Sequence, residues 1–199
     1  MFKNSAPVSA FLVMVFAALP LPLAEAEEST PPPASLIERS AAYFKVGAGQ
    51  VDAYRLCNGA GSQVVYRAFN KTRKGAAGVF IVTAEGALGP EDPGYGFDLA
   101  AAACGLVEKL PGEAALAARL YILFTPEARL YGMPVEDPER FRSAFNAPEI
   151  NPPSSSRENG GFLLDFWTRN TNTDVFYHLK VYIGREGRAT VRSKEKKRY

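Results

Sequence analysis

The chain has 199 residues, with 23 basic and 21 acidic side chains, a formal net charge of +2, and 47% hydrophobic residues. This length and composition predict one domain that buries a sizeable core without help from metals. Because the net charge is close to zero, the chain has no large basic surface to bind a nucleic-acid backbone, and we expect no nucleic-acid partner. One histidine and two cysteines are too few for a four-ligand zinc site, and we expect neither a metal nor a cofactor.

The first 26 residues have the three parts of a cleavable secretory signal peptide. Lys3 precedes an apolar stretch from Phe11 to Leu19, and Ala24-Glu-Ala26 follows as a small-residue cleavage site. The apolar stretch is about half of the ~20 residues that a spanning helix needs, and Pro20 ends it. We therefore expect cleavage, no further transmembrane segment, and a soluble product in the periplasm or outside the cell.

The mature chain is expected to begin with a flexible leader. Residues 27–34 are acidic and then proline-rich, which is typical of an extended linker. A single domain is predicted over residues 35–191, and a basic tail over residues 192–199.

Export changes the expected state of the two cysteines, because oxidising compartments form disulfides. Cys57 and Cys104 would close a loop for which the chain-entropy model gives about 4 kcal/mol of stabilisation. Two unpaired buried thiols are the alternative. We predict a Cys57–Cys104 disulfide.

Helices are predicted for the first part of the domain. Ser35-Leu-Ile-Glu38 fits a capping box, and the apolar stripe that follows it indicates a helix that ends near Cys57, with a kink or a division at Gly47-Ala-Gly49 as the alternative. A second helix is predicted over Ser62–Arg73, where apolar residues share one face and cations precede Gly75. The β-branched run Val79–Thr83 predicts a buried strand, with a helical turn as the alternative.

The middle of the chain predicts loops and two further helices. Residues 86–97 are expected to be loop, and Asp98 is the expected N-cap of a helix that carries Cys104 and ends near Leu110. An alanine-rich helix is expected from about Glu113 into Leu120–Phe124. A short strand is expected over Ala128–Tyr131. Residues 132–160 form a long proline-rich connection, which indicates either a functional cover or a missed element such as a helix over Glu139–Phe145.

The C-terminal part predicts an antiparallel β-meander with strands Phe162–Thr168, Val175–Ile183 and Arg188–Arg192. Helices first and a sheet last indicate an α+β fold, with N-terminal helices packed on the C-terminal meander. This order would suit a cone-like architecture of the NTF2 or cystatin kind, as an analogy of shape. Residues 192–199 hold five basic side chains and one acidic one, which indicates a solvated end or a weak contact with an anionic surface.

One polar pair stands out in the meander. If the first hairpin turns at Thr171-Asn172, Asp165 faces His178 beside an aromatic floor of Trp167, Phe176 and Tyr182, while the other face forms the core. A carboxylate that orients an imidazole suits a general base near neutral pH. The structural alternative is an ordinary cross-strand ion pair, worth a few tenths to about 1 kcal/mol.

No motif in the sequence indicates a particular reaction, because the sequence contains no GxSxG elbow, P-loop or CxxC pair. We expect an exported, non-catalytic binding or interaction module whose aromatic sheet face or long loops meet an unknown protein or small-molecule partner. The alternative is a lyase- or isomerase-type enzyme that uses the Asp165–His178 pair in a sheet-lined pocket. A third class is an envelope assembly factor that is recruited through the basic tail.

Overall fold

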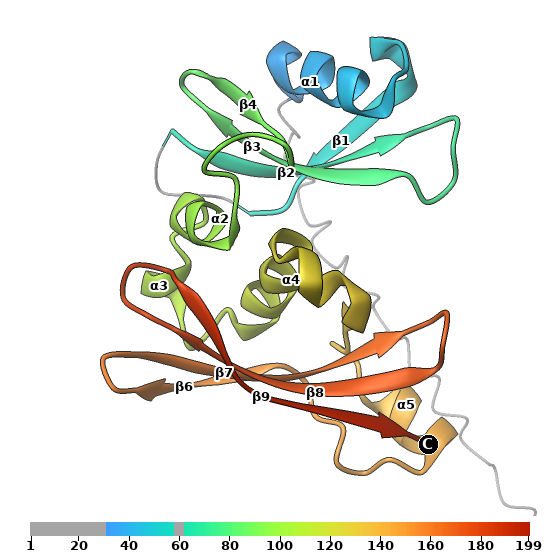
Figure 1. The fold of residues 1–199 in the computed structure, drawn as a ribbon, viewed down its shortest axis with the longest axis vertical. Helices are drawn as coiled ribbons and strands as arrows, with labels where there is room; N and C mark the ends of the chain where they lie inside the picture. Colours follow the sequence, from blue (N-terminus) through green and yellow to red (C-terminus); the bar gives the residue numbers. More distant parts are fainter. Residues whose placement is uncertain (1–30, 58–61) are drawn as a thin grey trace, which may run out of the picture. The chain divides into compact units, whose positions relative to one another are not determined.

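The computed structural model describes residues 31–57 and 62–199, and residues 32–199 form one compact unit (Figure 1). The predicted signal peptide lies outside the described residues. The unit contains helices and two antiparallel sheets, which confirms the predicted α+β fold. No helix within the described ranges is long and apolar enough to cross a membrane.

Helix α1 (Ala34–Phe44) is shorter than predicted and starts differently. Pro33 is its N-cap and no side chain caps it, so the predicted capping box is not formed. The helix ends where Lys45 adopts a left-handed conformation and its backbone amide reaches back to the helix carbonyls. The predicted continuation to Cys57 is wrong, because a short 3-10 helix η1 (Ala48–Gln50) and strand β1 (Val51–Arg55) follow.

Strands β1 to β4 form an N-terminal antiparallel sheet in chain order. The other strands are β2 (Val64–Asn70), β3 (Ala77–Thr83) and β4 (Gly86–Leu88). The helix predicted over Ser62–Arg73 is wrong, since this segment contains β2. Alternate residues of β2 are buried on opposite faces: Tyr66 and Ala68 pack in a cluster with Leu36 of α1, and Val65 packs in the main core. The strand predicted over Val79–Thr83 is confirmed by β3.

The middle segment forms short helices between the two sheets (Figure 1). They are α2 (Phe97–Ala103), α3 (Leu106–Lys109), α4 (Ala114–Phe124) and the 3-10 helix η2 (Pro126–Tyr131). The single helix predicted from Asp98 to Leu110 is divided at Gly105, which has a φ of +57°, and its N-cap is Gly96 rather than Asp98. The strand predicted over Ala128–Tyr131 is wrong, because η2 occupies it.

The C-terminal sheet confirms the predicted meander and extends it. Its strand order is β5-β7-β8-β9, and β6 also pairs with β7. The strands are β5 (Met133–Pro134), β6 (Ser154–Glu158), β7 (Gly161–Asn170), β8 (Val175–Ile183) and β9 (Ala189–Arg198). The predicted helix over Glu139–Phe145 is confirmed as α5. The segment predicted to be a solvated basic tail instead forms most of β9, where its backbone pairs with β8.

One hydrophobic core connects the two sheets through the helices between them. It joins Val65 and Ile81 of the N-terminal sheet, Leu120 of α4, and Phe166 and Leu179 of the C-terminal sheet. The apolar face predicted for the meander is therefore confirmed as core. A cone with one curved sheet does not describe this arrangement, because the N-terminal part has a sheet of its own.

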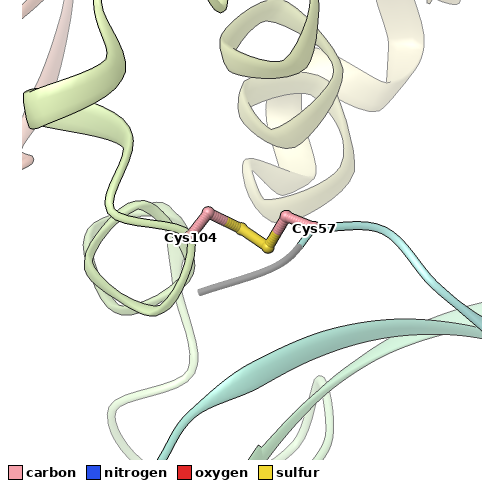
Figure 2. Close-up of a disulfide and its surroundings, with 2 residues drawn as sticks. All are labelled: Cys57 and Cys104. Carbon is pink, nitrogen blue, oxygen red and sulfur yellow. A yellow bond between two sulfur atoms is a disulfide. The ribbon is translucent and has the colours of Figure 1, made fainter. Parts of the chain in front are cut away.

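The predicted disulfide between Cys57 and Cys104 is formed (Figure 2). Cys57 follows β1 at the edge of the N-terminal sheet, and Cys104 caps the C-terminus of α2, with a Cα–Cα distance of 5.6 Å. Both residues are buried in the main core. The bond thus attaches an edge strand to the helices between the sheets.

Candidate functional site

The register of β7 on β8 differs by two residues from the predicted one. Trp167 pairs with His178, and Asp165 pairs with Lys180, whereas we expected Asp165 opposite His178. Because side chains alternate along a strand with a period of two, this shift leaves every side chain on its predicted face. The predicted partners are wrong and the predicted faces are right.

The structure still brings Asp165 and His178 together, as diagonal neighbours. The His178 Nε2 atom lies 2.6 Å from the Asp165 Oδ1 atom. The imidazole stacks on Trp167 with ring centroids 4.6 Å apart and an interplanar angle of 5°. The side chains of His178 and Asp165 are 20% and 36% exposed. The carboxylate therefore orients the imidazole through Nε2 and leaves Nδ1 for another group.

A second base occupies the other side of the Asp165 carboxylate. The Lys180 Nζ atom lies 3.6 Å from Asp165 Oδ2, and Glu195 of β9 is the backbone partner of His178. The pair thus belongs to a group of polar side chains on one face of the sheet, in which Asp165 and Lys180 carry opposite charges. Such cross-strand pairs stabilise a sheet without any catalytic role.

The predicted aromatic floor is not an open surface. Trp167 and Phe176 are only 4% and 0% exposed, because residues 135–150 cover them. The cover comprises Val135, Ala147 and Ile150, with Phe141 and Phe145 of α5 packed against them. The long connection, for which we expected a cover or a missed helix, folds over these two rings, so they form no open surface.

Tyr182, the third predicted aromatic residue, lies apart from the other two. It pairs with Leu163, four residues along β8 from His178. Its ring lies 5.0 Å from the Arg192 guanidinium, and its hydroxyl donates to the Asn159 carbonyl at 3.2 Å. The structure therefore does not join Tyr182 to Trp167 and Phe176 in one surface.

Strand β9 carries the largest concentration of charge in this sheet, and it is an edge strand paired only with β8. Lys194 contacts Tyr131, with its Nζ 3.2 Å from the hydroxyl. Lys197 pairs with Glu149 at 3.1 Å and lies 5.2 Å from the Trp167 ring. Lys196 and Arg198 form no ion pair with any described residue. Sequence reasoning identified the charge but missed the strand.

Glu149 fixes the end of β9 to the covering segment. Its carboxylate accepts hydrogen bonds from the Tyr199 hydroxyl at 2.7 Å and from Lys197 Nζ at 3.1 Å. These contacts, the Tyr199 hydroxyl first, and a backbone hydrogen bond lower the pKa of Glu149 to about 2. A lowered pKa in the folded state means that the stabilisation is complete above the ordinary value of 4.5 and is lost as the pH falls from there through about 2.

A pH series therefore tests this contact. We expect Glu149→Gln to lower the thermal unfolding midpoint at pH 7, and the difference from the wild type to shrink as the pH falls below about 4. Asp137→Asn, which changes another exposed carboxylate of the same segment with no ion pair among the described residues, is the control. A difference for Glu149→Gln that stays constant down to pH 2 would contradict the ionic contact.

The cavities among the described residues lie elsewhere. Four of them are lined by residues of α1, β2 and β3, of helices α3, α4 and η2, of strands β6 and β7, and of neighbouring loops, and none of the four is lined by Asp165 or His178. The described residues also contain no group of three or more histidine, cysteine, aspartate or glutamate side chains that could hold a metal ion.

Comparisons with models of protein families, with curated proteins and with solved structures found no match to this chain. A functional proposal must therefore rest on the geometry.

Proposed function

We propose that this protein is an exported, non-catalytic binding module that recruits a protein partner through the free edge of β9. The segment of the partner is extended and acidic, and it adds a strand to the C-terminal sheet. Main-chain hydrogen bonds supply affinity in this mode of recognition, and alternate side chains supply specificity. The observation that carries the proposal is the position of β9, a ten-residue strand at the end of the strand order.

The charge of β9 defines the chemistry of the partner. Lys194, Lys196 and Arg198 pair with alternate residues of β8 and therefore share one face, and Lys197 lies on the other. A partner strand with carboxylates at every second position would meet the three cations in register. Opposite charges on neighbouring strands contribute roughly 0.2–1 kcal/mol per pair.

The remaining sheet surface favours binding at the edge over binding on the face. The aromatic residues that would serve as anchors are covered, and the Asp165 carboxylate already contacts the His178 imidazole and the Lys180 ammonium group. Lys196 and Arg198, by contrast, have no described counter-ion. An acidic partner strand would provide one.

Export is part of the proposal. The Cys57–Cys104 disulfide is the state expected in an oxidising compartment, and cytosolic proteins rarely keep such bonds. The sequence of the first 26 residues supports the same interpretation. We therefore place the mature protein in the periplasm or outside the cell.

Fluorescence anisotropy with a labelled peptide tests the proposal. The probe is a short peptide of alternating Glu and Thr, titrated with the wild type and with Lys196→Glu combined with Arg198→Glu. Two attractive pairs become repulsive, so we expect roughly tenfold or greater weakening at low salt. The control reverses two exposed cations of the β2–β3 turn, Lys71→Glu with Lys74→Glu. Equal weakening by the two double variants would contradict binding at β9.

A second candidate function is favoured by the 2.6 Å contact between His178 and Asp165, which is the geometry of an oriented general base. A lyase or isomerase of this kind would lose about 10²- to 10⁴-fold in rate with His178→Gln and would be unaffected by the β9 charge reversals. Any activity found in a substrate screen that survives His178→Gln would exclude this candidate.

A further inference from the structure

Two arginine side chains line one small cavity beside the N-terminal sheet. Arg67 comes from β2 and Arg129 from η2, and the other lining residues include Tyr43 of α1 and Gly78 of β3. The cavity has a volume of about 120 Å³. A single water needs about 10–15 Å³ on the same measure, so there is room for a group of several heavy atoms.

Neither arginine has a counter-ion among the described residues. Arg129 donates from Nε and Nη2 to the Leu123 carbonyl, at 3.1 and 2.8 Å, which fixes its guanidinium and leaves Nη1 without a described partner. Arg67 is held by Phe69, whose ring centroid lies 5.2 Å from the guanidinium carbon. The Arg67 Nε atom is buried and makes no hydrogen bond.

The buried Arg67 Nε atom is the feature that favours an anion here, because a buried donor without an acceptor is unfavourable and an anion would supply one. Arg129 is exposed to solvent and adds a second cation at the same cavity. The arginine at a neighbouring cavity does have a counter-ion. Arg39 lines that cavity and is paired with Asp92 at 2.5 Å, and the Asp92 carboxylate also accepts a hydrogen bond from the Gly89 amide.

We propose that the Arg67–Arg129 cavity binds a small oxyanion group, a phosphate or a carboxylate. Planar guanidinium groups match both anions, because their N–H groups form a fork that donates to two oxygens. The Tyr43 ring forms one wall, 3.2 Å from the position where a Cβ atom would stand on Gly78, and the Tyr43 hydroxyl has no described partner. This site shares no residue with the β9 edge, and either proposal can fail alone.

Isothermal titration calorimetry of the mature protein tests the site. Inorganic phosphate and acetate are the two probes, each titrated at constant ionic strength with chloride as the reference anion. We expect saturable binding of phosphate, acetate or both, and at least about a tenfold loss of affinity in Arg67→Met and in Arg129→Met. Arg73→Met, which removes an exposed cation from the neighbouring turn, should bind like the wild type.

Two results would overturn the proposal. One is that neither probe binds beyond the chloride reference. The other is that Arg67→Met and Arg73→Met bind a probe equally well. If a methionine variant does not fold, Arg67→Lys provides the comparison, and the amide signals of Gly78 and Val79 in ¹⁵N NMR spectra should shift with phosphate or acetate but not with chloride. Unshifted signals there would also overturn it.

Discussion

Replacing both cysteines, Cys57→Ala with Cys104→Ala, is expected to lower the free energy of unfolding by about 2–5 kcal/mol. The disulfide attaches the end of β1 to α2, and it is the one disulfide among the described residues. Both cysteines are buried, so the loss includes their packing in the core.

Urea unfolding with and without reductant measures this effect. The unfolding midpoint of the wild type should fall when reductant is added, and that of the double variant should not change. The mass of the purified protein after alkylation, with and without prior reduction, shows whether the thiols are free. Free thiols in the purified protein would contradict the disulfide. A wild-type unfolding midpoint that is unchanged by reductant would contradict its stabilising effect.

Trp167→Ala is expected to lower the free energy of unfolding by about 3–5 kcal/mol. The indole is 4% exposed and lies in the cluster formed by the covering segment, with the His178 ring stacked on it. Its removal leaves a large space between β7 and residues 135–150. We expect the cost to be structural, because no open surface is lost.

Tyr182→Ala is the matched control for Trp167→Ala. Tyr182 is also aromatic and on the same face, but it is only half-buried, so we expect a cost of at most about 2 kcal/mol. Thermal or urea unfolding of the two variants gives the comparison. If Trp167→Ala were as stable as the wild type, the indole would not be part of a packed core.

The C-terminal sheet could be predicted because its strands alternate. One face of β7 and β8 is apolar and the other is mixed, and turn residues separate the strands. The Asp165–His178 contact could be predicted for the same reason, since an error of two residues in register keeps both side chains on one face. Only their pairing across the sheet required the structure.

Strand β2 of the N-terminal sheet could not be predicted because it is buried on both faces. Val65 packs against the main core while Tyr66 and Ala68 pack against α1, so the strand shows no alternation between apolar and polar residues. Its apolar residues also fit one face of a helix. Tertiary packing decides between the two patterns, and local propensity does not.

The sequence indicated a cover or a helix at residues 139–145, but neither the residues that it covers nor the extension of β9 through residues 192–198. Contact with distant residues orders both segments. In α5, Phe141 and Phe145 are the two residues that reach the aromatic cluster. In β9, backbone pairing with β8 orders the chain, while Tyr199 packs edge-on against Phe176 at 5.4 Å. The lysine-rich sequence of β9 contains no signal for this pairing.

The central claim is that the free edge of β9 pairs with an acidic strand. The most direct test is ¹⁵N NMR of the β9 backbone amides during titration with the Glu-Thr peptide and with the same peptide N-methylated at alternate residues. Both peptides have the same charge, but methylation removes the donors needed for a strand ladder. Our proposal predicts that β9 amides shift and become protected from exchange with the unmodified peptide alone. Equal responses to both peptides, or shifts that avoid residues 189–198, would contradict it.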